Sequence, residues 1–135
     1  MVVGLSQLVR NDDPAAIGAL WQAFLSQDIR SRLGAGACEN IYCVYHEYQG
    51  SVMDPYRMTI GYRTPVAEAP DGLHRADVPK QHVRTFTVKG PQPQALIAQW
   101  QAIWGADLDR SYIADYDVYD ANDPETVRVK VGVRS

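Results

Sequence analysis

The chain has 135 residues, of which 46% are apolar and 21% are charged. This length and balance fit one globular domain able to bury a core, and we expect that domain to span residues 1–135. The net charge of −3 comes with scattered basic residues, which argues against direct nucleic-acid binding. The first residues contain neither a basic leader nor a long apolar segment. The sequence therefore predicts a cytoplasmic protein without a membrane span.

The amino-terminal segment predicts a strand followed by a helix. Residues 2–9, VVGLSQLV, are rich in valine and alternate loosely between apolar and polar side chains, which favours a strand. Asp13 then suits an N-cap and Pro14 the first helical position. Apolar side chains at helical spacing predict the face that packs on a sheet: Ile17, Leu20, Trp21, Phe24 and Leu25.

Two further strands and a connector follow. Residues 40–48, NIYCVYHEY, and 56–63, YRMTIGYR, have the composition of strands. Residues 64–80 are rich in proline and polar side chains, which is typical of a connecting segment.

The second half repeats the order of the first. Residues 82–89, HVRTFTVK, predict a strand, and a helix opened by proline and ended by Gly105 follows. Residues 111–119 and 126–134 predict two more strands, separated by the turn sequence YDANDPET. The apolar face of the second helix is expected to consist of Leu96, Ile97, Trp100, Ile103 and Trp104.

The spacing of these elements indicates a duplication. Pro14 and Trp21 are as far apart as Pro93 and Trp100, and IGYR at 60–63 is echoed by VGVR at 131–134. We therefore expect an α+β fold of duplicated strand-helix-strand-strand modules, related by a pseudo-twofold axis, with a central cleft. Its parts are repeat one (1–63), a connector (64–80) and repeat two (81–135).

The segment IADYDVYD, residues 113–120, places two acids on one face of a strand. Asp115 and Asp117 are two residues apart, so both side chains point to the same side. They can line the wet face of an edge strand. Alternatively, a buried carboxylate asks for a cationic partner, and the many tyrosine and tryptophan rings of the chain could stack on a planar cation.

Several segments in chain order resemble the GyrI-like family, the effector-binding domain at the carboxyl end of AraC-type and BmrR-like transcription activators. These segments are IYCVYHEY, YRMTIGY, GLHRADVPKQHVRTFTVKGP, WQAIWG and YIADYDVY. The resemblance covers nearly the whole chain. It implies a duplicated, barrel-like domain that binds amphipathic, often cationic, drugs and dyes in an aromatic pocket with a buried acid. It also implies a relative that acts alone, because the chain is too short for a DNA-binding domain.

The resemblance also suggests site residues. The family's Asp-aromatic-Glu-any-Tyr pattern falls on residues 115–119, so Asp117 takes the place of the glutamate and is one methylene shorter. Asp115 is expected nearer to solvent, whereas Trp21 and Phe24 are expected in the core. The candidate ligand-binding residues are Asp117, Tyr45, Glu47, Tyr56, Trp100, Trp104 and Tyr119.

Other functions remain as alternatives. Asp117 or Glu47 could activate water in a small hydrolase of the GyrI-like type, although no nucleophile motif supports one and we assign no catalytic residue. A protein that acts on DNA gyrase through an acidic surface is a third reading. We expect no cofactor and no metal, because Cys38, Cys43 and His46 lack the spacing of a zinc site. A homodimer or a separate regulator protein stays open as a partner.

Overall fold

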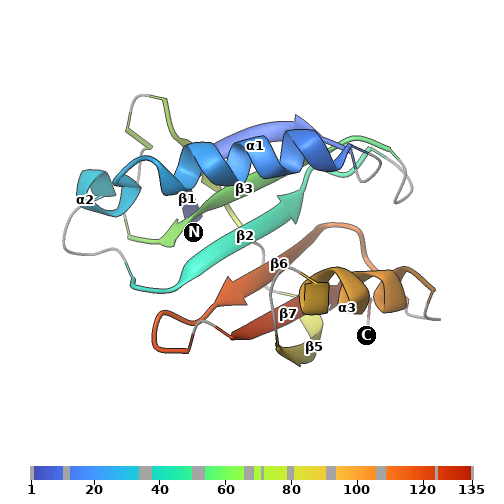
Figure 1. Ribbon diagram of the computed structural model, residues 1–135. Helices are drawn as coiled ribbons and strands as arrows, with labels where there is room; N and C mark the ends of the chain where they lie inside the picture. Colours follow the sequence, from blue (N-terminus) through green and yellow to red (C-terminus); the bar gives the residue numbers. More distant parts are fainter. Residues whose placement is uncertain are drawn as a thin grey trace.

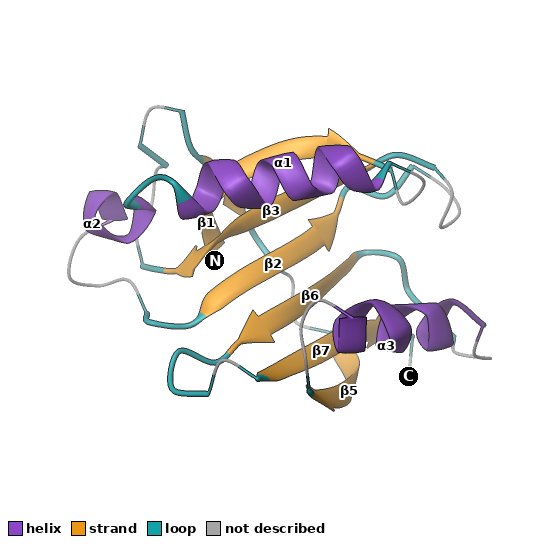
Figure 2. Cartoon of the chain, viewed as in Figure 1, coloured by secondary structure: helices purple, strands orange, loops and turns teal. Residues whose placement is uncertain are grey.

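The structure, a computed structural model, contains one antiparallel seven-stranded sheet with its two longer helices on one face (Figures 1 and 2). It describes residues 2–10, 13–33, 38–49, 54–65, 69–70, 72–78, 81–90, 94–105, 109–123 and 125–134. The strand order is β4-β1-β3-β2-β6-β7-β5. The α+β class is as expected, but within the described residues the sheet is open, so the barrel-like closure is wrong. No helix in the described ranges is long and apolar enough to cross a membrane.

The elements of the first half follow the expected order. Their bounds are β1 (Val2–Val9), α1 (Pro14–Leu25), α2 (Ile29–Leu33), β2 (Ile41–His46) and β3 (Tyr56–Arg63). The Asp13 carboxylate accepts a hydrogen bond from the Ala16 amide at 3.3 Å. Asp13 is therefore the N-cap of α1, as predicted, with Pro14 opening the helix.

The second half adds its own strands and helix. Their bounds are β5 (His82–Lys89), α3 (Gln94–Gly105), β6 (Ala114–Tyr119) and β7 (Thr126–Val133). The halves meet where β2 pairs with β6, from Ile41 opposite Tyr119 to His46 opposite Ala114. Outward from this seam the strands run β3 then β1 on one side, and β7 then β5 on the other. The proline expected to open α3, Pro93, lies outside the described residues.

Each helix covers a core on its own half of the sheet (Figure 1). Leu20 and Phe24 of α1 are buried, and so are Leu96 and Ile103 of α3. The seam residue Tyr119 packs against both cores. A third, smaller cluster with Val44 and Tyr116 lies on the opposite face of the sheet. The seam is therefore packed on both faces.

Three apolar residues expected on the buried helix faces are instead exposed. Leu25 of α1 and Ile97 of α3 each follow a buried residue directly, and Trp104 follows the buried Ile103. Adjacent positions on a helix are about 100° apart. A residue directly after a buried one therefore points away from the buried face of the helix. The predicted buried faces were one position too wide.

The connector 64–80 contains structure that the sequence did not predict. β4 (His74–Ala76) pairs antiparallel with β1, and both Leu73 and Ala76 are buried. The short helix α2 was also missed, although Ile29 and Leu33 are buried. Both elements are too short to show a period of their own.

Strands β1 and β3 approach closely at a pair of glycines. Gly4 is directly opposite Gly61. A Cβ atom on Gly4 would lie 1.9 Å from the Ile60 carbonyl oxygen, and one on Gly61 would lie 2.0 Å from that of Val3. Only glycine fits at these two positions.

Candidate functional site

The two acids of β6 lie on the helix-covered face of the sheet, and both side chains are 0% exposed. Asp117 accepts hydrogen bonds from the Tyr45 hydroxyl and, at 3.2 Å, from the indole Nε1–H of Trp100. Tyr45 comes from β2 and Trp100 from α3. One carboxylate at the seam is thus held by donors from both halves of the chain.

No lysine or arginine in the described part of the chain forms an ion pair with Asp117. Burial raises the pKa of Asp117 to about 7, even though the hydrogen bonds from Tyr45 and Trp100 favour the ionised form and lower it. Asp117 therefore changes its protonation state near neutral pH. A cation bound beside it would stabilise the charged form.

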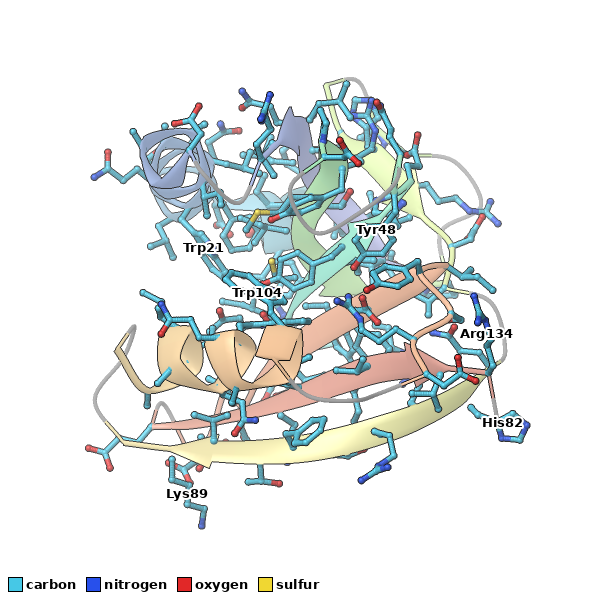
Figure 3. All side chains as sticks on the ribbon, turned by 90° about the vertical axis from the view of Figure 1, so that its right-hand side faces the viewer. Trp21, Tyr48, His82, Lys89, Trp104 and Arg134 are labelled. Carbon is cyan, nitrogen blue, oxygen red and sulfur yellow. The ribbon has the colours of Figure 1, made fainter. Side chains whose placement is uncertain are left out.

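Aromatic rings surround this carboxylate. The Tyr45 ring centroid lies 5.2 Å from that of Trp100 and 5.9 Å from that of Tyr56, both in edge-to-face geometry. Tyr119 packs against Trp21 of α1 at 5.0 Å. Figure 3 shows Trp21 and Trp104 on the sides of α1 and α3 that face one another. We call Asp117, Tyr45, Tyr56, Trp100 and Tyr119 the Asp117 cluster.

The tyrosines of the Asp117 cluster stay protonated. Burial, followed by the nearby Asp117 charge, raises the pKa of Tyr45 and of Tyr119 well above the usual value. Burial, Cys43 and Asp117 also raise the pKa of Tyr56. The cluster thus presents neutral ring faces, which attract a cation, around one titratable carboxylate.

Two of the predicted site residues lie outside this cluster. Trp104 is 41% exposed on α3. The Glu47 side chain is 59% exposed and its carboxylate forms an ion pair with Arg57 at 3.0 Å. Glu47 has a positive φ of 53°, which ends the alternation of β2. The break turns Glu47 outward and brings Tyr48 inward, the reverse of what strict alternation predicts for these two residues.

Asp115 corrects a second expectation, because it is buried rather than solvated. Its carboxylate accepts hydrogen bonds from Arg110 Nη2 at 2.6 Å, from the Gly132 amide at 2.7 Å and from the Tyr48 hydroxyl. β6 has a partner strand along each edge, and Asp115 lies on its helix-covered face with a side chain that is 0% exposed. Asp115 therefore belongs to a buried ion pair.

A family model described as "Cass2: Integron-associated effector binding protein" matches residues 1–130. The chain belongs to this family. Among solved structures, an integron cassette protein from the mobile metagenome of Vibrio cholerae has the same fold, with a TM-score of 0.82 and 22% sequence identity. The match covers 98% of this chain and 89% of that chain. No curated protein matches the chain.

This membership agrees with the effector-binding domain that the sequence indicates. The family description names an effector but not its chemistry. The nature of the ligand must therefore be argued from the side chains of this chain.

Arg110 is a residue of this region that the sequence reasoning missed. It is only 7% exposed, and its guanidinium carbon lies 4.4 Å from the ring centroid of Tyr112 and 5.9 Å from that of Trp100. A β-bridge to Val133, the last residue of β7, holds Arg110 in this position. Arg110 precedes the predicted strand segment, and no spacing rule pairs a loop arginine with an acid on a neighbouring strand.

Cys43 of β2 is directly opposite Asp117 in the sheet. Its thiol is buried, and burial together with the Asp117 charge raises the pKa of Cys43 well above its usual value. The thiol is therefore not a ready nucleophile. The described residues contain no group of three or more histidine, cysteine, aspartate or glutamate side chains placed to hold a metal ion.

Proposed function

We propose that the protein binds amphipathic cationic small molecules, with Asp117 as the countercharge and the aromatic rings of its cluster as the stacking surface. The observation that carries the proposal is a carboxylate with 0% exposure and no lysine or arginine partner among the described residues. An unpaired charge in apolar surroundings costs several kcal/mol. A bound cation removes that cost, so the free energy of binding is concentrated at Asp117.

The hydrogen bonds already made by Asp117 leave some of its acceptor positions unused, so a ligand can still bind to the carboxylate. A carboxylate has about four acceptor positions, and Tyr45 and Trp100 use only part of them. Each favourable cation–ring contact adds about 0.5–2 kcal/mol. Rings and one acid select for flatness and positive charge, so we expect the site to accept several planar cations.

Within this proposal, the two halves of the chain are repeats related by a pseudo-twofold axis. The equal strand succession outward from the seam supports this. The site then lies where the repeats meet, with Tyr45 from one repeat and Trp100 from the other. A sensor that passes its ligand-bound state to a separate regulator protein would use such a site.

The proposal is one of binding rather than catalysis. The neutral Cys43 thiol beside Asp117 supports it, because a hydrolase acting here would need another nucleophile or an activated water. Release of p-nitrophenol from p-nitrophenyl acetate, faster with the protein than with its Asp117→Asn variant, would favour the hydrolase instead.

The test compares two acridines at about pH 8, where Asp117 is ionised. 9-Aminoacridine is protonated under these conditions and acridine is neutral, while the ring systems match. We expect 9-aminoacridine to bind in the micromolar range, at least about tenfold more tightly than acridine. Asp117→Asn should abolish this preference, and Asp77→Asn, on an exposed surface acid, should keep it. Equal binding of both dyes to the unaltered protein would contradict the proposal.

A further inference from the structure

The Arg110 guanidinium has donors without acceptors. Its Nη2 atom donates to Asp115 at 2.6 Å, but the buried Nε and Nη1 atoms have no hydrogen-bond partner among the described residues. Arginine offers five N–H donors. A buried donor left without an acceptor costs about 1–3 kcal/mol, and more when the group is charged. Such a group calls for an acceptor that the described residues do not supply.

Arg110 lies beside the Asp117 cluster. Its guanidinium carbon is 5.9 Å from the ring centroid of Trp100, and the indole Nε1–H of Trp100 donates to Asp117. The acid that holds Arg110, Asp115, is two residues from Asp117 on β6. Two residues along a strand advance about 7 Å. The unpartnered donors and the unpaired carboxylate are therefore close enough for one small molecule to meet both.

Aromatic rings also surround Arg110. Tyr48 and Tyr112 contact one another at 5.8 Å, and both lie within 6.0 Å of the guanidinium carbon. Tyr112 is 38% exposed and is the outermost of these rings. It has a φ of 55°, a left-handed conformation that is unfavourable for tyrosine and recurs at ligand-binding sites. Its ring stacks on Arg110 from the more exposed side.

The charges of the site decide which kind of acceptor fits. Asp115, Asp117 and Arg110 together carry a net charge of −1 when Asp117 is ionised. A ligand with one positive charge brings this sum to zero. A ligand carboxylate beside Arg110 would restore the excess negative charge next to two buried acids. A neutral carbonyl oxygen accepts the free N–H donors without adding charge.

We propose that the ligand is a planar monocation that also carries a neutral carbonyl oxygen, about 7 Å from its positive charge. Asp117 pairs with the cation, and Arg110 donates through Nε–H or Nη1–H to the carbonyl oxygen. This inference rests on the proposed function, because it takes Asp117 as the partner of the cation. It adds a second contact that selects among cations.

The experiment uses three 1-methylquinolinium compounds that differ only at position 6: the acetyl and ethyl cations and the carboxylate zwitterion. Ethyl has the same two carbon atoms as acetyl but lacks the carbonyl oxygen, so only acetyl carries a hydrogen-bond acceptor. In calorimetric titrations at about pH 8, the acetyl compound should bind about tenfold more tightly than the ethyl compound. This ratio is expected for a hydrogen bond from a charged donor. The carboxylate compound should bind more weakly than the acetyl compound.

Arg110→Lys is the matched variant, because lysine keeps the positive charge for Asp115 but lacks the guanidinium donors. The acetyl-to-ethyl ratio should fall below about twofold, with the ethyl compound changed by less than about threefold. Asp117→Asn should weaken both compounds and leave their ratio unchanged. If Arg110→Lys does not fold, the affinities of the three compounds for the unaltered protein still test the inference.

The outcomes separate this inference from the proposed function. Equal affinity of the acetyl and ethyl compounds, or a ratio that survives in Arg110→Lys, would overturn this inference and leave cation binding at Asp117 intact. If the carboxylate compound binds most tightly, the inference that Arg110 donates to a neutral carbonyl is wrong. Failure of all three to bind would overturn both the inference and the proposed function.

Discussion

Asp115 and Asp117 point to the same face of β6 and are equally buried, but only Asp115 has an arginine beside it. Asp115 also accepts hydrogen bonds from the Gly132 amide and the Tyr48 hydroxyl. Asp117 accepts hydrogen bonds from two neutral side chains. Two like side chains of one strand therefore have different tasks. Asp115 pairs with Arg110 within the fold, whereas Asp117 is the carboxylate that we propose pairs with a ligand.

Replacement of Asp117 by asparagine should change how stability depends on pH. Between about pH 4 and about pH 7 the folded protein holds a proton on Asp117 that the unfolded chain has released, so stability falls as pH rises through this window. The fall attributable to Asp117 is at most about 4 kcal/mol. Urea unfolding of Asp117→Asn across this range should lack this fall, and near pH 8 the variant should be at least as stable as the parent.

Binding of a cation should have the opposite pH dependence. A quaternary dye such as 1-methylquinolinium keeps its charge at every pH, so any change in affinity reports on the protein. Because the ionised form of Asp117 binds the cation and the pKa of Asp117 is about 7, affinity should rise about tenfold between pH 6 and pH 8. A flat profile would contradict the role of Asp117. The same rise in Asp117→Asn would assign the effect to another group such as His46.

Trp100→Phe should shift that profile. The substitution keeps an aromatic ring but removes the Nε1–H that favours the ionised carboxylate. The pKa of Asp117 should therefore rise, and the midpoint of dye binding should move to higher pH. Trp104→Phe is the matched control, because Trp104 makes no hydrogen bond to Asp117 within the described residues. Titrations of both variants between pH 6 and pH 9 would reveal whether only the first midpoint moves.

Asp115→Asn should destabilise the fold. The change leaves the buried Arg110 guanidinium without its countercharge, and loss of one partner of a buried ion pair costs about 3–5 kcal/mol. Urea unfolding near pH 8 should separate this variant clearly from Asp117→Asn. A small, equal effect of the two substitutions would show that the Arg110 pair does not hold the seam.

Gly4→Ala should disrupt the pairing of β1 with β3. The added Cβ would lie 1.9 Å from the Ile60 carbonyl oxygen, so the strands must separate, at a cost of about 1–3 kcal/mol or more. Gly18→Ala is the control, since a Cβ at this exposed position of α1 meets nothing within 4 Å. Thermal unfolding should show a loss for Gly4→Ala and a gain of about 0.5–1 kcal/mol for Gly18→Ala.

The regular elements could be predicted from the sequence because their periods are long enough to read. β1 and β3 have the expected bounds, and the N-cap at Asp13 is where the Asp-Pro pair indicates. β4 could not be predicted, because a three-residue edge strand is defined by its pairing with β1 rather than by its own composition. The fold was therefore readable except where tertiary contacts determine the local structure.

The candidate site was readable only in part. Asp117, Tyr45 and Trp100 come together as the strand register and the helix face require. Glu47 was misplaced, because a positive φ at a residue other than glycine leaves no mark in the sequence and reverses the alternation after it. Arg110 was missed because its position depends on a bridge to Val133.

The seam between β2 and β6 also bears on how the molecule opens. Among the described residues, the ladder between β2 and β6 joins the two halves of the sheet, and each half has its own core. Such units tend to open separately, as local unfolding events of different free energy. A ligand bound at Asp117, as proposed, would contact side chains from both halves and would couple the two opening events. Ligand binding would then make the opening of the two halves cooperative. The amides of β2 and β6 would exchange their hydrogens together, and more slowly than in the free protein.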